Sequence, residues 1–506
     1  MQKSNPSEQI RLGAIISYFA IVISIISAML YTPWMKNQIG DSNYGLYTLV
    51  SSLISIFLMD FGLGTSATRF IAKYRAAHDD KSVNDVLGYI FKLYILIDIL
   101  IVLTLVIVYF LIDGIYIGLD AEEIYTFKKV YVVFASYSII SFPFTPLSGI
   151  LNAHEKFVQL KLCDLFQKLF AIFLIVIALT SHYGIVALVF MNAFSGFVTI
   201  CLKFWIVTRN KMGKPNFKVR NKLLLNGLVS FSVWMTVLAI SQRMIFNIAP
   251  SVLGVTSNSM EIARFAPASQ LEGYFFTFAN AINGLFLPTV VRYDQDSNSE
   301  KFITLLKKVG RYQICMLGLI FTGLAVLATD FVELWMGKDY RISGICAVLM
   351  IFPSLLMYPL QIADTLIAVR NKVKYQALAY LFIGVVNIVL SLVLTPSLGA
   401  LGSSISIFVA YSINFLFLNI IYRNQLQLNL KSFYFNVYFR YLPIIGVSIL
   451  LSYFIVKVNS IAGWRGFCID VVTCVIVYLV LLVVFGLSRN ERNKVKNMIT
   501  NNVLRK

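Results

Sequence analysis

The sequence predicts an all-α, polytopic membrane protein with about 14 transmembrane helices. Of its 506 residues, 58% are hydrophobic and only 13% are charged, whereas a soluble domain carries about a quarter charged residues. The apolar residues form runs of about 17–25, the length that crosses a hydrocarbon core as an α-helix. This composition leaves too little polar surface for a soluble globule, and it is unlike that of a disordered chain.

Each predicted span is one apolar run. In chain order the runs cover residues 12–31, 46–64, 88–110, 130–151, 163–180, 184–207, 227–250, 266–290, 312–329, 345–366, 376–394, 400–422, 441–457 and 467–487. The first run is longer than the apolar segment of a signal peptide and lacks a small-x-small cleavage site. We therefore expect it to be retained as the first span.

The distribution of basic residues predicts the orientation. The net charge is +19, with 43 Lys and Arg against 24 Asp and Glu. With the N-terminus inside, 31 of the basic residues fall in inner segments, 8 in outer loops and 4 within spans. Because Lys and Arg collect in cytoplasmic loops, both termini are predicted to be cytoplasmic. The same distribution explains the excess of basic over acidic residues. We therefore expect contact with membrane lipids and no nucleic-acid partner.

Nothing in the sequence favours catalysis. The six cysteines form no C-x-x-C pair, and the three histidines lie far apart near span ends. There is no H-E-x-x-H motif and no phosphate-binding loop. We expect no catalytic residue, no cofactor and no metal.

A weak internal repeat predicts two similar halves. Leu151 and Leu366 end spans four and ten, 215 residues apart, and Gly184 and Gly399 follow at the same offset. The offset covers six spans, an even number, so the two copies have the same orientation in the membrane. The predicted domains are two parallel six-helix lobes, 1–215 and 216–432, followed by two extra helices and a basic cytoplasmic tail, 433–506. Two such lobes are what an alternating-access transporter needs.

Three loop segments resemble one known family. Gln38 to Tyr47 is similar to the L-G-x-x-x-Y-G-x-Y pattern of its first outer loop. Asp60 to Arg69 resembles the exit of its second span, and Glu333 to Tyr340 resembles its W-x-G loop after span nine. Over most of its length the chain is similar to the polysaccharide/oligosaccharide flippases of the O-antigen flippase type. They belong to the superfamily of multidrug, oligosaccharidyl-lipid and polysaccharide exporters.

This resemblance implies a function and a location. It implies a flippase of the bacterial cytoplasmic (inner) membrane that moves an undecaprenyl-diphosphate-linked oligosaccharide to the outer leaflet, coupled to an ion gradient. A polysaccharide polymerase is a candidate partner. Two alternatives stay open: a multidrug or toxin cation exchanger of the same superfamily, and a membrane polymerase or glycosyltransferase. The short outer loops disfavour the enzyme.

Charged residues inside spans are the candidate substrate site, because burying them in a membrane is costly. Arg243 in span seven can bind phosphate oxygens bidentately, with Gln242 and Asn247 as neighbouring hydrogen-bond donors. Glu272 reaches a similar depth from span eight. The alternative is an Arg243–Glu272 salt bridge that never meets substrate.

The remaining embedded charges are candidates for other roles. Asp98, near the middle of span three, and Asp60 in span two are candidates for ion coupling or cavity lining, since an unpaired carboxylate there can take up a proton. The alternative is that both are buried hydrogen-bond partners. Lys92 is a candidate cavity residue, although it can also reach the membrane surface. Asp164 and Lys168 are spaced for a pair within one helix. Asparagines in the spans are expected to form interhelical hydrogen bonds.

Overall fold

The computed structural model describes residues 6–57, 59, 61–295, 299–370, 372–459 and 461–486, and within these residues it is helical, with no strand. The predicted all-α membrane fold is therefore confirmed. Asp60 and the basic tail beyond residue 486 lie outside the described residues.

The helices follow one another with short connections. They are α1 (Pro6–Ile39), α2 (Asp41–Phe57), α3 (Leu63–Ala76), α4 (Asp80–Ile115), α5 (Ala121–Ser141), α6 (Pro146–Ala153), α7 (Phe157–Thr180), α8 (Ile185–Arg209), α9 (Lys222–Phe246), α10 (Ala249–Thr256), α11 (Ser259–Gln295), α12 (Ser299–Met336), α13 (Arg341–Met357), α14 (Ile362–Val369), α15 (Val373–Leu426), α16 (Leu430–Phe433), α17 (Phe439–Val458) and α18 (Gly463–Leu481). The short 3₁₀ segments are η1 (Phe142–Phe144), η2 (Lys338–Tyr340) and η3 (Tyr358–Leu360), and the π-helical segments are η4 (Tyr434–Tyr438) and η5 (Leu482–Gly486).

Within the described residues, 11 helical segments are long and apolar enough to cross a membrane. The predicted spans outnumber them for three reasons. α2 has only 17 residues, α11 carries many polar side chains, and α15 joins two predicted spans in one 54-residue element. α15 bends at Gly399, whose φ of 53° and ψ of −132° interrupt the helix. The two helical segments pack against each other after this turn, since the hydroxyls of Ser391 and Ser403 form a hydrogen bond of 3.2 Å.

The described helices pack into two compact units. One contains Met1–Ala266 and Val373–Ala410, and the other contains Pro267–Lys372 and Tyr411–Lys506. The chain crosses between the units three times, inside α11, between α14 and α15, and inside α15, so two of the three connections are helical. The predicted lobes were defined by the sequence repeat, whereas these units are defined by helix packing. The predicted lobe boundaries therefore remain a prediction.

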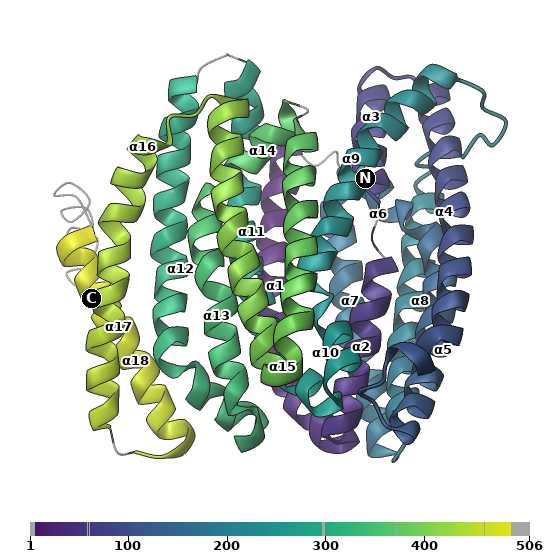
Figure 1. Cartoon of the computed structure of the whole chain (residues 1–506). Helices are drawn as coiled ribbons and strands as arrows, with labels where there is room; N and C mark the ends of the chain where they lie inside the picture. The colour runs from purple at the N-terminus through teal and green to yellow at the C-terminus, as the bar shows by residue number, and fades with distance from the viewer. Residues whose placement is uncertain are drawn as a thin grey trace, which may run out of the picture. The chain divides into compact units, whose positions relative to one another are not determined.

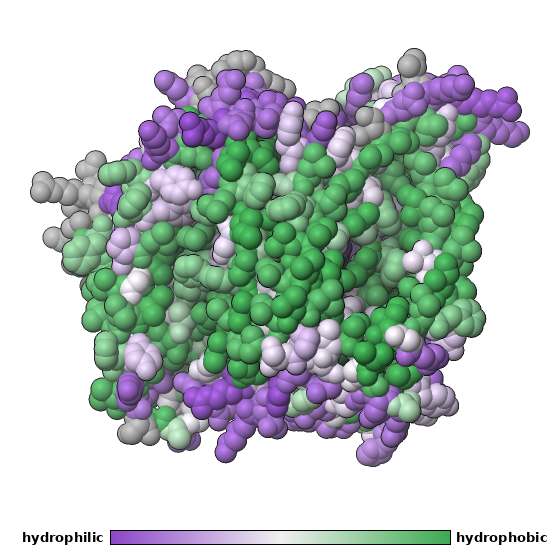
Figure 2. All heavy atoms as spheres, viewed as in Figure 1, coloured by the Kyte–Doolittle hydropathy of each residue, from purple (hydrophilic) through white to green (hydrophobic). Residues whose placement is uncertain are grey.

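Helix direction alternates in the first unit (Figure 1). The turns after α3, α6 and α8 lie at one end, and the turns after α1, α4 and α7 lie at the other. In both units hydrophobic side chains cover the flanks of the helices, and polar side chains gather at the helix ends (Figure 2). Phe110 and Leu30, for example, are 74% and 72% exposed. Such surfaces suit the hydrocarbon layer of a membrane.

Spans four and ten break in the same way. α5 is followed by η1 and the eight-residue α6, and α13 is followed by η3 and the eight-residue α14. Proline occurs near both breaks, where its missing N–H and fixed φ favour a change of helix type. This shared break supports the internal repeat predicted from the sequence.

The Tyr-Gly-x-Tyr motif lies in the first turns of α2, where three helix starts meet. Gly40 ends α1 with a φ of 84°, a conformation that favours glycine. Gly45 packs so closely that a Cβ atom on it would lie 2.1 Å from the carbonyl oxygen of Ser259 in α11. Glu123 of α5 accepts hydrogen bonds from the hydroxyls of Ser42 (2.6 Å) and Ser259. One carboxylate thus joins the starts of α2, α5 and α11.

Replacing Gly45 with alanine is expected to destabilise the protein even though alanine favours helices by about 1 kcal/mol over glycine. The added methyl group would meet a backbone atom that cannot rotate away, and overpacking of this kind costs about 1–3 kcal/mol. Thermal unfolding of the purified protein in detergent measures the effect. Gly114→Ala in α4 is the control, because no atom lies within 4 Å of its added Cβ. Equal melting temperatures for the two variants would contradict the close approach.

Candidate functional site

Arg243, Gln242 and Asn247 lie together at the end of α9 in the first unit. Arg243 is in the last turn of this helix, which ends at Phe246, earlier than the predicted residue 250. Its Nη1 donates a hydrogen bond of 3.1 Å to Asn247 Oδ1, and Gln242 is half-buried beside it. The hydroxyl of Ser52 in α2 donates to the backbone carbonyl of Asn247. The guanidinium is thus held by one neutral amide, and its charge has no carboxylate partner among the residues of the first unit that the structure describes.

Glu272 belongs to the second unit, on α11. Only 5% of its surface is exposed, and its Oε1 accepts a 3.0 Å hydrogen bond from the hydroxyl of Tyr358. The side chain of Ser354 also contacts this carboxylate, so its partners among the described residues of this unit are neutral hydroxyls. The predicted Arg243–Glu272 pair joins residues of different units and stays a prediction.

A chain of side-chain amides continues along α11 from Glu272. Gln361, just before α14, donates to Asn280 (2.8 Å) and accepts from Asn283 (2.6 Å). Asn283 in turn accepts from Gln313 of α12 at 2.8 Å. These bonds tie three helices together through neutral groups, as expected for asparagines within spans.

Tyr358, Gln361 and Gln313 were not among the predicted site residues. Their sequence signal is weak, because a single glutamine or tyrosine in an apolar run is common. Gln361 has one usable clue, its position two residues after Pro359 at the break of span ten. A proline break frees backbone groups and admits polar side chains nearby.

Asp98 is a half-buried carboxylate in the middle of α4. Its Oδ1 atom is buried and has no hydrogen-bond partner among the described residues. Its neighbours Ile95, Leu96 and Ile99 are 47%, 58% and 54% exposed, so this stretch of α4 faces the apolar surroundings. Lys92 is exposed, with its ammonium group 5.8 Å from the centre of the Tyr89 ring. The roles predicted for both residues stay predictions.

Two other predictions about embedded polar residues have clear outcomes. The predicted Asp164–Lys168 pair is wrong: Asp164 binds Lys203 of α8 at 2.9 Å, and Lys168 donates to Ser24 of α1 at 2.6 Å. Helix α7 packs against both α8 and α1. Side chains of those two helices therefore lie closer to Asp164 and Lys168 than these two residues lie to each other. Asn387 donates to the carbonyl of Met244 at 3.2 Å, a contact between helices as expected.

Comparison with known proteins identifies the family. A sequence profile described as polysaccharide biosynthesis protein matches residues 10–293, more than half of the chain. The chain belongs to this family. No curated protein sequence matches it significantly.

Solved structures show the fold of this family member. A lipid II flippase, MurJ, in an inward closed conformation has a TM-score of 0.69 and 16% identity, covering 94% of this chain and 98% of that one. An inward-facing multidrug resistance transporter of the MATE family, in the MOP superfamily, has a TM-score of 0.69 and 14% identity, covering 82% and 98%. A MOP superfamily transporter from Pyrococcus furiosus has a TM-score of 0.60 and 14% identity, covering 84% and 97%. At these identities the likeness concerns the fold.

Breaking the amide chain is expected to destabilise the second unit. Gln361→Leu would remove the donor to Asn280 Oδ1 and the acceptor of Asn283 Nδ2, and a buried unsatisfied group costs about 1–3 kcal/mol. Asn283→Leu should cost a similar amount. Because the two residues bind each other, the double variant should lose less than the sum of the single losses.

Thermal unfolding of the four proteins in detergent completes this double-mutant cycle. Asn436→Leu is the control, since the amide of Asn436 binds only Ser432 of its own helix turn among the described residues. Additive losses at Gln361 and Asn283 would mean that the hydrogen bond between them contributes nothing.

Proposed function

We propose that this protein is a flippase that moves an undecaprenyl-diphosphate-linked oligosaccharide from the cytoplasmic to the outer leaflet, for O-antigen, capsule or another surface polysaccharide. The observation that carries the proposal is the match to a polysaccharide biosynthesis family in a chain with the fold of a lipid II flippase. A membrane protein of this family needs no active site of its own if it moves a precursor made elsewhere. The proposed protein is a transporter and not an enzyme.

The chemistry of the cargo supports the candidate residues. A sugar diphosphate is anionic and strongly hydrated, and it needs polar partners while it crosses the hydrocarbon layer. The Arg243 guanidinium can bind two phosphate oxygens at once. Amide groups such as those of Gln242 and Asn280 can bind sugar hydroxyls. We assign Arg243, Gln242, Asn247, Glu272 and Lys92 to the substrate path.

The proposed orientation follows from the charge distribution. Both termini lie in the cytoplasm of a bacterial cell, because 31 of the basic residues would then lie on the inner side and 8 on the outer. The protein would act in the inner membrane, and the polymerase of the same pathway is its proposed partner.

Asp98 is the proposed ion-coupling residue. A buried carboxylate oxygen without a hydrogen-bond partner costs free energy when it is charged, and taking up a proton removes this cost. Binding and release of a proton can then favour different conformations of the transporter. Asp60, the other carboxylate predicted for this role, lies outside the described residues.

A multidrug or toxin cation exchanger is the second candidate, because the chain shares its fold with a MATE family transporter. Such a protein would bind small organic cations and would need no phosphate-binding group. Drug susceptibility of cells without other exporters distinguishes the two functions. Resistance conferred by this chain, with no effect on surface polysaccharide, would replace the flippase proposal.

Arg243→Gln is expected to lower flipping about 10- to 100-fold, the loss that follows from removing one charged hydrogen-bonding group. Arg243→Lys should keep part of the activity, because its point charge attracts phosphate without the bidentate fork. Surface polysaccharide on cells that depend on this chain is the measurement, with protein level checked by immunoblot.

The double variant Arg243→Gln, Glu272→Gln separates transport from architecture. Losing both members of a structural pair is often tolerated, so normal polysaccharide in this variant would remove Arg243 from the substrate path. Lys129→Gln is the matched control in the same unit, since this exposed lysine only lies over the Tyr125 ring among the described residues.

Asp98→Asn is expected to abolish gradient-driven flipping and to leave folding and substrate binding intact. Asparagine has nearly the same volume and removes a charge whose Oδ1 has no partner among the described residues. Flipping of a fluorescent lipid-linked sugar in vesicles with an imposed proton gradient measures the effect. Asp113→Asn on the same helix is the control, because its carboxylate is 60% exposed and pairs with Lys128. Gradient-driven flipping at the normal rate in Asp98→Asn would exclude this residue from coupling.

A further inference from the structure

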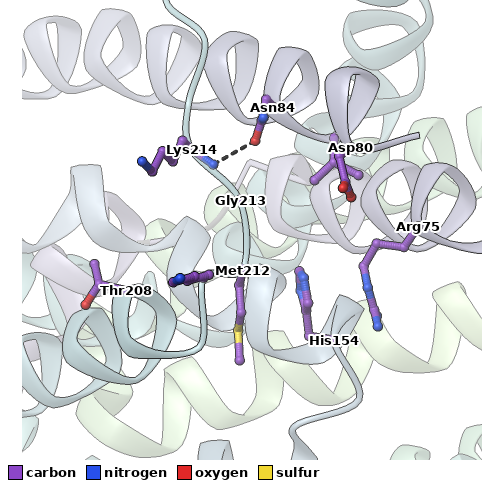
Figure 3. A pocket seen from close by; sticks show the side chains of 10 residues that line it. Arg75, Asp80, Asn84, His154, Thr208, Met212, Gly213 and Lys214 are labelled. Carbon is purple, nitrogen blue, oxygen red and sulfur yellow. Dashed lines mark hydrogen bonds between the residues drawn. The ribbon is translucent and has the colours of Figure 1, made fainter. Parts of the chain in front are cut away.

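A cavity of about 570 Å³ lies at the end of the first unit where α3, α6 and α8 end and α4 begins (Figure 3). Its volume is in the range of small-molecule sites. The charged, amide and imidazole side chains that line it are those of Arg75, Asp80, Asn84, His154, Lys211 and Lys214. None of the residues assigned above to the substrate path or to ion coupling lines this cavity.

The three helices that end at the cavity share one kind of turn. A residue with positive φ follows each of them: His78 (56°), Glu155 (56°) and Lys211 (48°). The backbone N–H of each residue donates to a carbonyl three residues earlier, at 3.0, 3.0 and 3.1 Å. These bonds close the helix ends and fix the direction in which the chain leaves them.

The linker between α8 and α9 folds back onto the start of α4. The backbone N–H of Lys214 donates to Asn84 Oδ1 at 2.7 Å, as Figure 3 shows, and Asn216 Nδ2 donates to Asp85 Oδ1 at 2.7 Å. Gly88 allows this contact, because a Cβ atom there would lie 1.9 Å from the carbonyl oxygen of Asn216. The linker is therefore held in place over α4, and its lysines stand at the rim of the cavity.

The cavity is positively charged. Among the described residues, Lys211, Lys214 and Asp80 form no ion pair with one another or with other side chains. Arg75 donates to the carbonyl of Ala153 and keeps its charge. The lining thus contains three cations and one carboxylate.

His154 adds a neutral ring to this lining. Burial lowers the pKa of its imidazole, and Arg75 and Lys156 nearby lower the pKa further. Its Nδ1 donates to the carbonyl of Ile150 at 2.9 Å, which leaves Nε2 as an acceptor for a hydroxyl. A ligand with an anionic part and a hydroxyl part suits this combination of groups.

The position of the cavity along α8 indicates the depth at which a ligand would bind. Thr208 lines it, about one turn beyond the exposed aromatic side chains of Phe204 and Trp205. The guanidinium of Arg209 lies 4.9 Å from the centre of the Trp205 ring. Tryptophan and arginine at the end of a membrane helix are typical of the head-group region. A cavity at this level meets lipid head groups.

We propose that this cavity binds the head group of an anionic phospholipid, with the phosphate between Arg75, Lys211 and Lys214 and the glycerol hydroxyls near His154 and Asn84. Basic pockets at the cytoplasmic ends of membrane helices are suited to such lipids. The proposal does not depend on what the protein transports. It requires only that this end of the first unit lies at a membrane surface.

Native mass spectrometry of the whole protein, titrated with phosphatidylglycerol in detergent, tests the proposal. The wild type should bind phosphatidylglycerol in preference to zwitterionic phosphatidylethanolamine. The double variant Lys211→Ala, Lys214→Ala should bind it about 10- to 30-fold more weakly, as expected for the loss of two cations near an anionic lipid. The Asn84 contact uses the backbone N–H of Lys214, so alanine preserves the fold of the linker.

The control is Lys218→Ala, Arg220→Ala, which removes two exposed cations of the same linker that do not line the cavity. An equal loss in this control would show a general charge effect and would overturn the proposal, as would unchanged binding in the Lys211, Lys214 variant. A parallel titration uses inorganic phosphate and glycerol 3-phosphate. Protection from thermal unfolding by these soluble ions at the same concentrations would mean that the ligand is soluble and not a lipid.

Discussion

Water is absent from the hydrocarbon layer of a membrane, so each polar group placed there needs a partner inside the protein. Helices meet this need for the backbone, and side chains meet it by reaching across helix contacts. Lys203 reaches Asp164, Lys168 reaches Ser24, and Gln361 joins Asn280 to Asn283. These contacts fix which faces of the helices meet.

The two units satisfy this requirement in different ways. In the first unit Lys203 is paired with Asp164 and Arg243 lies at a helix end, whereas Asp98 lies in the middle of α4 with no partner for Oδ1 among the described residues. In the second unit much of the buried hydrogen bonding runs through neutral amides along α11. Neutral amides can exchange one hydroxyl partner for another at little electrostatic cost, whereas an isolated guanidinium strongly favours an anion. A cargo with both phosphate and sugar parts would use both kinds of group.

The sequence predicted the membrane fold, because apolar runs and loop charges follow directly from the bilayer. It predicted spans four and ten as unbroken helices, although prolines stand at both breaks, Pro143 and Pro146 in one and Pro359 in the other. The sequence did not predict the partners of Asp164 and Lys168, since spacing along the chain indicates only contacts within one helix. Gln361 and Tyr358 were missed for a similar reason. Their importance comes from lying opposite α11, and neither residue type signals this by itself. The cavity near Lys214 depends on how a linker folds back, which loop composition does not reveal.

The carboxylate of Glu123 has a consequence for the order in which the chain assembles during synthesis. Its hydroxyl partner Ser42 precedes it and is already made when α5 emerges. Its other partner, Ser259, follows it by 136 residues. At about 5–20 residues per second the ribosome needs roughly 7 to 27 s to cover that distance. During this interval α11 has not yet been made, so Glu123 lacks its Ser259 partner. The starts of α2 and α5 are then joined through Ser42 alone.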